Sequence, residues 1–587
     1  MKMKRIFDIL DLYRLPGRIN GEAFGKRVNE QWISISASDY LLAVEQLSLG
    51  FLELGVKTGD KIATILKNAP EWNFIDMALL QIGAVQVPIY PTISNASYSF
   101  IFNDAEVRFV FVTDQSIYDK LKDVLPINET IEEVFSIEPT EGLRNWKDIT
   151  GLGMKSSKSS ALENIKNSIS ENDLATLIYT SGTTGSPKGV MLSHQNLMSN
   201  SIGATQILSH NPISRSLSFL PLCHVLERIM NYTYQQHGAT IYYCDNIELL
   251  SDYIRTSQPE MFAAVPRVLE KTYDKIMAKG RDLKGIKKIL FFWAVKLGEQ
   301  YEPWGNQGWW YNFRLGIARK LIFSKWHAAF GGKLNAMVSG GASLQERLAR
   351  IFWAAGFQVI EGYGLSETSP IIAVGNFLPK GVKVGTVGPV LPGVEVKIAE
   401  DGEILCKGPN VMMGYYKRDD LTKEIFDKDG WLHTGDIGKF EGVYLRITDR
   451  KKEIFKTSNG KYVAPQPIEN KLKESSFIEN ALVVGEAKNY AAAIIVPAFN
   501  HIESWCRVKG RVYPGPEKAI ADEVIRKRIE REINHMNETI DQTEQIKRFT
   551  LITDSWNVDT GELSPTMKLK RKFLQLKYAG MIEELYK

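Results

Sequence analysis

Residues 174–190 place a short apolar strand directly before a loop of Ser, Thr and Gly, and no other stretch restricts the fold as strongly. Residues 174–179 are apolar and β-prone, as in a buried strand. In the loop, glycines let backbone N–H groups approach an anion, hydroxyls add donors, and Lys188 adds a positive charge. The stretch therefore predicts a phosphate site at a strand end. Its predicted contact residues are Ser181, Gly182, Thr183, Thr184, Gly185 and Lys188.

The spacing of this loop differs from that of a P-loop. Two residues separate Gly182 from Gly185, and Lys188 follows a proline. A P-loop has four residues between its glycines and a lysine directly after the second. The competing interpretation is a flexible surface linker. Linkers seldom follow an apolar strand or end in Pro-Lys-Gly-Val, so the stretch predicts a phosphate loop of another type.

Strand and helix patterns alternate before this loop. Helical spacing of apolar residues at 35–57 and 72–80 alternates with strand-like runs at 62–66, 83–90 and 109–113. Such alternation is typical of a parallel α/β sheet covered by helices. The N-terminal part is therefore predicted to consist of α/β layers.

The length of 587 residues exceeds what one core supports, so we expect a large body and at least one smaller domain. Residues 151–172 are rich in Ser, Lys and Asn and predict a loop. Near the C-terminus, strand-like runs at 481–484, 493–496 and 549–552 flank helical patterns at 517–548. This order predicts a small α+β domain.

Composition and charge exclude several classes of protein. The net charge of +4 argues against general nucleic-acid binding. The four cysteines and eight histidines lie far apart, without metal spacing or an HExxH sequence, which argues against a protein-bound zinc and fits a reducing cytosol. The N-terminus lacks a signal-peptide core, and no run reaches the roughly 18 apolar residues of a spanning helix. We expect a cytoplasmic protein that is soluble or at most membrane-associated.

Residues 281–330 interleave basic residues with tryptophans. Interleaved cations and aromatic rings are typical of a helix that lies in a membrane interface. The alternative is an insertion that packs on the main body with solvated lysines, since amphipathic surface helices of soluble proteins look much the same. The sequence leaves both interpretations open.

A strand at 216–220 ends at Pro221-Leu222-Cys223-His224. In open α/β sheets, ligands bind at the carboxyl ends of strands, although a lone histidine is usually structural or exposed. His224 is therefore a candidate site residue.

Two further strands, at 334–338 and 357–361, run into glycine turns. Together with the Ser181 loop, these turns could enclose one nucleotide at the carboxyl edge of a sheet. Tyr363 offers an aromatic face for a purine, and Glu367 offers a hard oxygen ligand for Mg²⁺. The alternative is a pair of ordinary strand turns with a core tyrosine.

Two charged segments follow. Asp436 lies in a Thr-Gly-Asp turn, where a carboxylate could bind the hydroxyls of a ribose or could simply stabilise the turn. Residues 447–453 carry a charge run that would by itself be a solvated turn.

Six motifs, in a fixed order from residue 179 to residue 572, resemble those of the long-chain fatty acyl-CoA synthetases in the adenylate-forming, AMP-binding superfamily. A further segment, at 261–271, resembles the long-chain members in particular. The motifs are Tyr-Thr-Ser-Gly-Thr-Thr-Gly-Ser-Pro-Lys-Gly-Val (179–190), Leu-Pro-Leu-Cys-His-Val-Leu-Glu-Arg (220–228), Tyr-Gly-Leu-Ser-Glu-Thr (363–368), Thr-Gly-Asp (434–436), Asp-Arg-Lys-Lys (449–452) and the basic segment 561–572.

The resemblance implies an α/β fold with a large N-terminal AMP-binding domain, residues 1–449, and a small mobile α+β lid, residues 450–587. It implies that a fatty acid and ATP form an acyl-adenylate and pyrophosphate, and that CoA then yields acyl-CoA and AMP. A fatty acyl-AMP ligase or an acyl-carrier-protein synthetase of the same fold is the alternative. The implied partners are fatty acid, ATP, CoA and Mg²⁺, with no nucleic acid, in a monomer or homodimer, cytoplasmic or peripheral to the inner face of a membrane through 281–330.

The same resemblance implies roles for single residues. Lys568 matches the catalytic lysine of the lid, Lys452 the hinge, and Arg450 a nucleotide-contacting arginine, while His224 lies where the substrate carboxylate enters. Asn459-Gly460 replaces the Gly-Gly of many long-chain members, a mild departure because Asn tolerates positive φ. The implied catalytic residues are Lys568, Lys188, His224, Glu367 and Arg450; the implied metal ligands are Thr184 and Glu367; the implied cofactor-binding residues are Ser181, Gly182, Thr183, Thr184, Gly185, Gly340, Gly341, Ala342, Glu361, Gly362, Tyr363, Gly364, Thr368, Asp436, Lys452, Ser458 and Gly460.

Overall fold

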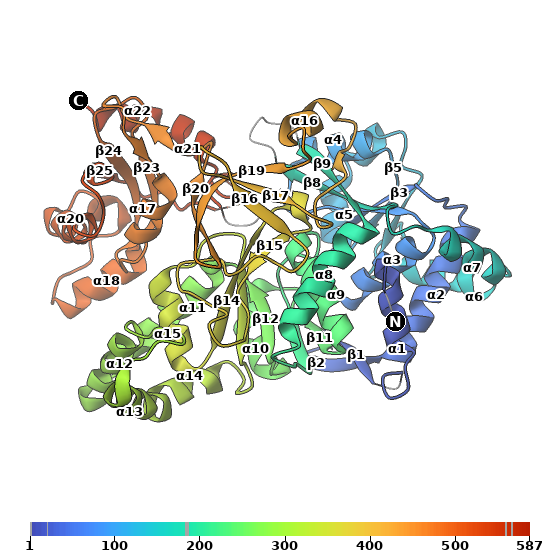
Figure 1. Cartoon of the computed structure of the whole chain (residues 1–587), viewed down its shortest axis with the longest axis horizontal. Coiled ribbons are helices and arrows are strands. Elements are labelled where there is room, and N and C mark those ends of the chain that lie inside the picture. Colours follow the sequence, from blue (N-terminus) through green and yellow to red (C-terminus); the bar gives the residue numbers. More distant parts are fainter. Residues whose placement is uncertain (1–2, 20, 182–186, 558–559, 565–567) are drawn as a thin grey trace.

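The computed structural model describes residues 3–19, 21–181, 187–557, 560–564 and 568–587 of the chain. It contains two eight-stranded sheets, a four-stranded sheet and a separate C-terminal unit (Figure 1). The phosphate-loop residues Gly182, Thr183, Thr184 and Gly185 lie outside the described residues.

The first large sheet carries the strand that precedes the predicted phosphate loop. Its inner strands β4, β3 and β5 pair in parallel, as the alternating pattern predicts, and β8 and β9 form an antiparallel hairpin at one side. In spatial order the strands are β18 (Gly414–Tyr415), β9 (Pro187–Ser193), β8 (Leu174–Ser181), β4 (Val85–Pro88), β3 (Lys61–Ile65), β5 (Val107–Val112), β6 (Glu133–Ser136) and β7 (Arg144–Asn145).

The second large sheet carries both predicted glycine turns. Strands β10, β12, β13 and β14 pair in parallel, so their carboxyl ends share one edge of the sheet. In spatial order the strands are β15 (Ile371–Val374), β14 (Gln358–Gly364), β13 (Ala336–Gly340), β12 (Met261–Ala264), β10 (Arg215–Ser218), β11 (Thr240–Tyr243), β1 (Glu22–Val28) and β2 (Gln31–Ser36).

Helices α3 (Pro70–Gln81) and α9 (Val225–His237) pack between the two large sheets. A buried ion pair joins them, with Arg228 Nη2 of α9 2.6 Å from Asp76 Oδ1 of α3. Arg228 also donates to Thr176 of β8, at 2.8 Å. Removing one partner of such a fully buried pair would leave an uncompensated charge, so this contact fixes α9, and with it the strand end that bears His224, against the first sheet.

The prediction of a loop over 151–172 is wrong. Helix α6 (Trp146–Met154) extends into this segment, and α7 (Ser159–Ser168) follows it. Gly153 lets α6 approach α2 (Ala37–Glu53) closely, because a Cβ there would lie 1.9 Å from the carbonyl oxygen of Gln46. In α7, Leu162 is buried at the inner face while the Ser, Lys and Asn side chains cover the solvent side. Polar composition therefore concealed a one-sided helix.

A four-stranded antiparallel sheet links the body to the C-terminal unit. Its strands, in spatial order, are β16 (Glu395–Ile398), β17 (Glu403–Lys407), β19 (Leu432–Glu441) and β20 (Tyr444–Arg450). The predicted domain boundary falls at the end of β20.

The C-terminal unit has its own apolar clusters on the two faces of a three-stranded sheet. The sheet consists of β23 (Ile478–Val484), β24 (Ala491–Pro497) and β25 (Ile546–Leu551). Helices α17 (Pro465–Leu472) and α20 (Glu523–Asn537) pack together on one side, and the short hairpin of β21 (Phe455–Lys456) and β22 (Tyr462–Val463) precedes α17. In Figure 1 this orange-to-red unit lies beside the body. The N-terminus and the C-terminus of the chain lie far from each other.

Candidate active site

The two predicted glycine turns lie side by side at the carboxyl edge of the second sheet. Gly340 of β13 is the register partner of Gly362 of β14. Gly364 cannot be replaced without moving the backbone, because a Cβ would lie 1.6 Å from the carbonyl oxygen of Pro370. Gly341 has φ of +85° and is followed by the exposed Ala342. Gly341 therefore leaves open backbone where a ligand could approach, whereas Gly364 is required by the packing of its own turn.

Tyr363 connects this edge to the four-stranded sheet. Its hydroxyl donates to Asp436 Oδ2 at 2.8 Å, and Arg450 Nε lies 3.1 Å from Asp436 Oδ1. Asp436 and Arg450 are register partners on β19 and β20, so the pairing of these two strands holds their side chains together beside Tyr363. Burial and the charge of Asp436 raise the pKa of Tyr363 well above its usual value, so the phenol stays protonated and holds the carboxylate.

Glu367 and Lys188 meet through a residue that the sequence analysis missed. Tyr415 of β18 donates to Glu367 Oε1 at 2.7 Å, and the Lys188 ammonium lies 5.1 Å from the centre of the Tyr415 ring. The arrangement follows from strand pairing, since Tyr415 lies opposite Val190 on the strand that carries Lys188. No spacing in the sequence marks Tyr415 as a neighbour of the motif that contains Lys188.

Two other residues of the Glu361–Thr368 segment are held by backbone groups. Glu361 Oε2 accepts from the Leu344 N–H at 3.1 Å, and burial raises its pKa to about 7. The Thr368 hydroxyl accepts from the Leu365 N–H at 3.0 Å and donates to the Pro370 carbonyl at 2.6 Å. Thr368 therefore fixes the shape of the turn that presents Glu367.

His224 caps the N-terminus of α9. Its Nδ1 accepts from the Leu226 N–H at 3.2 Å, so the neutral ring carries its proton on Nε2. Burial lowers the pKa of His224 to about 4, and the positive charge of Lys568 contributes. At neutral pH this ring is an uncharged donor and not a base.

Lys568 comes from the C-terminal unit and lies within electrostatic reach of Arg450, Asp436 and His224. Burial and, to a smaller extent, the nearby Arg450 lower its pKa to about 8, against the opposing effect of Asp436 and Glu453. Two direct contacts hold the unit here: Asn470 Nδ2 donates to Ser343 Oγ at 2.6 Å, and Arg267 Nη2 lies 3.3 Å from Glu479 Oε1. The structure thus brings Lys568 to the candidate site.

Lys452, Ser458 and Gly460 are exposed on the C-terminal unit. Lys452 is exposed in the turn after β20. The Ser458 hydroxyl donates to Asn489 Oδ1 at 2.6 Å, and Gly460, with φ of +80°, lies between β21 and β22. Lys452 lies in the chain between Arg450 and Glu453, whose charges act on the pKa of Lys568.

Among the described residues, no group of three or more His, Cys, Asp or Glu side chains could hold a metal ion. A Mg²⁺ ion that arrives with a nucleotide needs less, since it keeps waters and phosphate oxygens and takes one or two carboxylates from the protein. Glu367 fits that limited requirement, because Tyr415 occupies one of its oxygens and supports the carboxylate.

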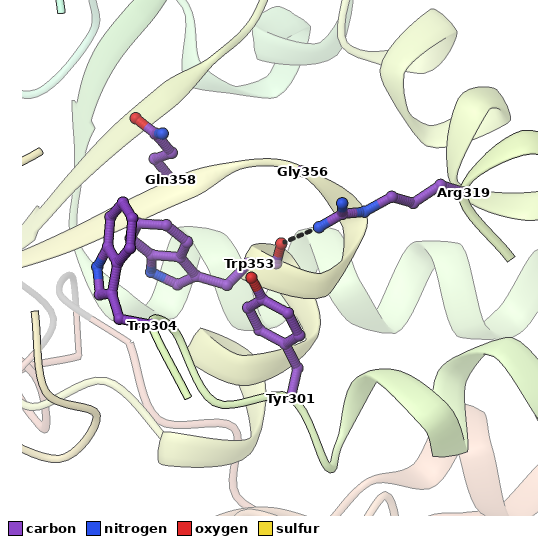
Figure 2. Close-up of a pocket in the computed structure, with 6 residues that line it drawn as sticks. All are labelled: Tyr301, Trp304, Arg319, Trp353, Gly356 and Gln358. Carbon is purple, nitrogen blue, oxygen red and sulfur yellow. Dashed lines mark hydrogen bonds between the residues drawn. The ribbon is translucent and has the colours of Figure 1, made fainter. Parts of the chain in front are cut away.

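A cavity lies at the opposite end of β14. Its volume is about 210 Å³, and Figure 2 shows the side chains around it. Gln358, at the start of β14, is one of its walls, whereas Gly362 and Tyr363 lie at the other end of that strand. This cavity is therefore separate from the candidate site. Its lining residues are Tyr301, Trp304, Arg319, Trp353, Gly356 and Gln358.

Comparison with known proteins agrees with this geometry. Residues 20–416 match the family described as AMP-binding enzyme, and residues 452–587 match the AMP-binding enzyme C-terminal domain. The chain belongs to the AMP-binding enzyme family. This confirms the family that the six motifs indicated, and it confirms the α/β fold class with a large N-terminal and a smaller C-terminal domain.

Members of the AMP-binding family resemble the chain over nearly its full length. It is 33% identical over 576 residues to a long-chain-fatty-acid–CoA ligase of Mycobacterium bovis, covering 96% of this chain and 94% of that protein. It is 32% identical over 608 residues to long-chain-fatty-acid–CoA ligase 1 of Homo sapiens, covering 97% of this chain and 84% of that protein. The adenylation domain of a carboxylate reductase from Mycobacterium chelonae shares the fold, with a TM-score of 0.76 at 19% identity, covering 99% of this chain and 91% of that one.

Proposed function

We propose that the protein activates a long-chain fatty acid with ATP to an acyl-adenylate and then transfers the acyl group to CoA, releasing AMP. The observation that carries the proposal is a convergence at the end of β14: Lys568 from the C-terminal unit meets Arg450 and Asp436 of the four-stranded sheet, beside Tyr363. The long-chain-fatty-acid–CoA ligases related to this chain support the choice of substrate.

The first step brings a carboxylate to a triphosphate, and the two repel each other. Attack of the carboxylate oxygen on the α-phosphorus forms the acyl–phosphate bond and breaks the bond to pyrophosphate. Negative charge then develops on the α-phosphoryl oxygens, and fixed cations stabilise it more than they stabilise the ground state. Lys568 and Lys188 would supply those cations. Mg²⁺, held by Glu367 and phosphate oxygens, would neutralise part of the triphosphate charge when bound.

His224 suits the entry of the substrate carboxylate. As a neutral Nε2–H donor it can bind an anion without removing a proton, and the fatty acid is already ionised at neutral pH. Asp436, fixed by Tyr363 and Arg450, is suited to accept from the ribose hydroxyls. No protein nucleophile is required, because the substrate carboxylate performs the attack.

The second step needs an opening for the CoA thiol where Lys568 now lies. A rotation of the C-terminal domain about Lys452 would remove Lys568 and bring the Ser458–Gly460 segment to the site. The CoA thiol loses its proton to solvent and its sulfur attacks the acyl carbonyl carbon. The bond from that carbon to the phosphate oxygen of AMP breaks, and AMP leaves. The exposure of Lys452 and of the Ser458–Gly460 segment supports such a movement, since neither is buried in the present arrangement.

A panel of fatty acids, scored by pyrophosphate release, tests the proposal. With free CoA we expect long-chain acyl-CoA and AMP in equal amounts. Accumulation of acyl-adenylate despite free CoA, or acyl transfer only to the phosphopantetheine of an acyl carrier protein, would favour the ligase or carrier-protein alternative.

The four buried free cysteines support a reducing, cytoplasmic location.

A further inference from the structure

Helix α13 (Gly308–Ala318) and the π-helical turn η4 (Arg319–Phe323) expose a continuous apolar stripe. Trp310, Phe313, Ile317 and Leu321 follow one another at helical steps and are 55%, 56%, 37% and 45% exposed. Trp309, beside them, is 78% exposed. The opposite side is also apolar, since Leu315, Ala318 and Ile322 are buried there. A helix of a globular protein normally has one polar face, so the outer stripe has no role in packing this fold.

Helix α12 (Gly285–Gly298) extends the stripe. Ile286 and Ile289 are exposed, and they lie on the same face of α12 as Trp293. The helices run antiparallel, because the Tyr311 hydroxyl donates to the Leu297 carbonyl at 2.7 Å and Arg314 lies over the Trp293 ring at 5.7 Å. That pairing sets the two isoleucines level with the Ile317–Leu321 end. In Figure 1, α12 and α13 form one corner of the molecule. We name this set the apolar face: Ile286, Ile289, Trp309, Trp310, Phe313, Ile317 and Leu321.

The helices of the apolar face and the segments that flank them carry cations without carboxylate partners among the described residues. Between residues 284 and 325 the only acids are Glu299 and Glu302, and Glu302 pairs with Arg350. Within the described chain, none of the eight Lys and Arg side chains of this segment forms an ion pair with a carboxylate. They are Lys284, Lys287, Lys288, Lys296, Arg314, Arg319, Lys320 and Lys325.

We propose that the apolar face docks on an anionic lipid bilayer and lies in its interface. Exposed tryptophans and isoleucines suit the boundary of headgroups and acyl chains, and the unpaired cations complement anionic headgroups. A second copy of the chain is a poor occupant, because two such faces would oppose one positive patch to another. The proposed docking does not involve a membrane-spanning helix; among the described residues no helix is long and apolar enough to cross a membrane. The inference does not depend on the reaction.

Sedimentation with lipid vesicles tests this proposal on the full-length protein. We expect the protein to sediment with vesicles of phosphatidylcholine and phosphatidylglycerol, less with phosphatidylcholine alone, and less again when salt is added. The double variant Trp310→Ser with Phe313→Ser should bind at least about tenfold more weakly, because membrane affinity scales with inserted apolar area. Lys287→Gln with Lys320→Gln should reduce the preference for phosphatidylglycerol.

Val512→Ser is the matched control, because Val512 is 92% exposed on the C-terminal unit, outside the apolar face. It should bind vesicles like the wild type, and all variants should keep the wild-type thermal midpoint and activity on a soluble substrate. The proposal is overturned if the wild type stays in the supernatant with anionic vesicles, or if the Trp310 and Phe313 variant binds as well as Val512→Ser. A fall from dimer to monomer in that variant by light scattering, without lipid binding by the wild type, would instead assign the face to a second copy.

Discussion

The C-terminal domain presents two different surfaces. One carries Lys568, which lies against the body within reach of Arg450 and His224. The other carries the Ser458–Gly460 segment, which is exposed and bonded to its own domain through Asn489. The two-step reaction needs a cation in the first step and a thiol channel in the second. From this difference we propose that the structure has the arrangement for adenylation, and that the second surface serves after a rotation of the domain.

Replacing Lys568 should separate the two surfaces most strongly. Lys568→Ala should slow adenylation by about 10²–10³, the usual effect of removing one preorganised group that stabilises transition-state charge. Thioester formation from supplied acyl-adenylate should stay near the wild-type rate, because that step uses the other surface. Measuring both half-reactions on one preparation checks this. Equal loss in both would remove the distinction between the two surfaces.

Glu367→Gln sharpens the assignment of the adenylating side. The amide keeps the shape but loses the charge, so we expect adenylation about 10-fold to 100-fold slower and a higher Mg²⁺ requirement. Tyr415→Phe is the matched control, since it removes the hydrogen bond to Glu367 and retains the carboxylate. It should raise the Mg²⁺ requirement less than Glu367→Gln does, because the carboxylate remains and only its hydrogen-bonded support is lost. Identical Mg²⁺ titrations for Glu367→Gln and the wild type would make Glu367 a structural residue.

The pH dependence should also differ between the two half-reactions. Lys568 has a pKa lowered to about 8 by burial, so its protonated fraction falls as pH rises through that value. The kcat/KM of adenylation, which reports the free enzyme, should therefore fall by up to about tenfold per pH unit above 8. Thioester formation should lack this descending limb. Lys568→Arg should move the limb to higher pH, and an unmoved limb would assign it to another group.

A smaller effect is expected from a contact beside Lys452, the proposed hinge. Lys451 Nζ lies 2.5 Å from Asp401 Oδ2 and 2.8 Å from Glu403 Oε2 on the body side. Lys451→Ala removes two partly exposed ion pairs that favour the present arrangement, so the lid equilibrium should shift by a few-fold, about 1 kcal/mol or less. Adenylation should slow and thioester formation should quicken slightly. Lys439→Ala, on a more exposed pair with Glu441, should change neither rate.

The sequence predicted the residues at the strand ends better than the contacts that join them to the rest of the candidate site. Strand ends with glycine turns identified Gly340, Gly362 and Tyr363, because backbone geometry there needs particular residues. Tyr415 escaped notice, since its position depends on the pairing of β18 with β9, and its hydrogen bond to Glu367 joins residues 48 positions apart. The docked position of Lys568 was equally hidden. It depends on surface contacts such as Asn470 with Ser343, which carry no sequence pattern.

The helices over 151–172 illustrate the same limit on the fold. Their Ser, Lys and Asn residues suggested a loop, while Leu162 and the close approach at Gly153 decide the structure. Packing against α2 stabilises these helices more than local propensity predicts. The apolar face on α12 and α13 was visible in sequence as interleaved cations and aromatic rings, and the structure resolved which of them are exposed.

A reversible lock tests the two-surface account most directly. Asn470 and Ser343 meet across the domain boundary at 2.6 Å, so Ser343→Cys with Asn470→Cys should form a disulfide that holds the lid in its present position. The four native cysteines are buried, which limits wrong pairing. When oxidised, this variant should keep pyrophosphate exchange with ATP and lose acyl-CoA synthesis, and a reductant should restore synthesis, while each single variant stays active. Normal acyl-CoA synthesis by the fully oxidised protein would contradict the claim that the lid must turn.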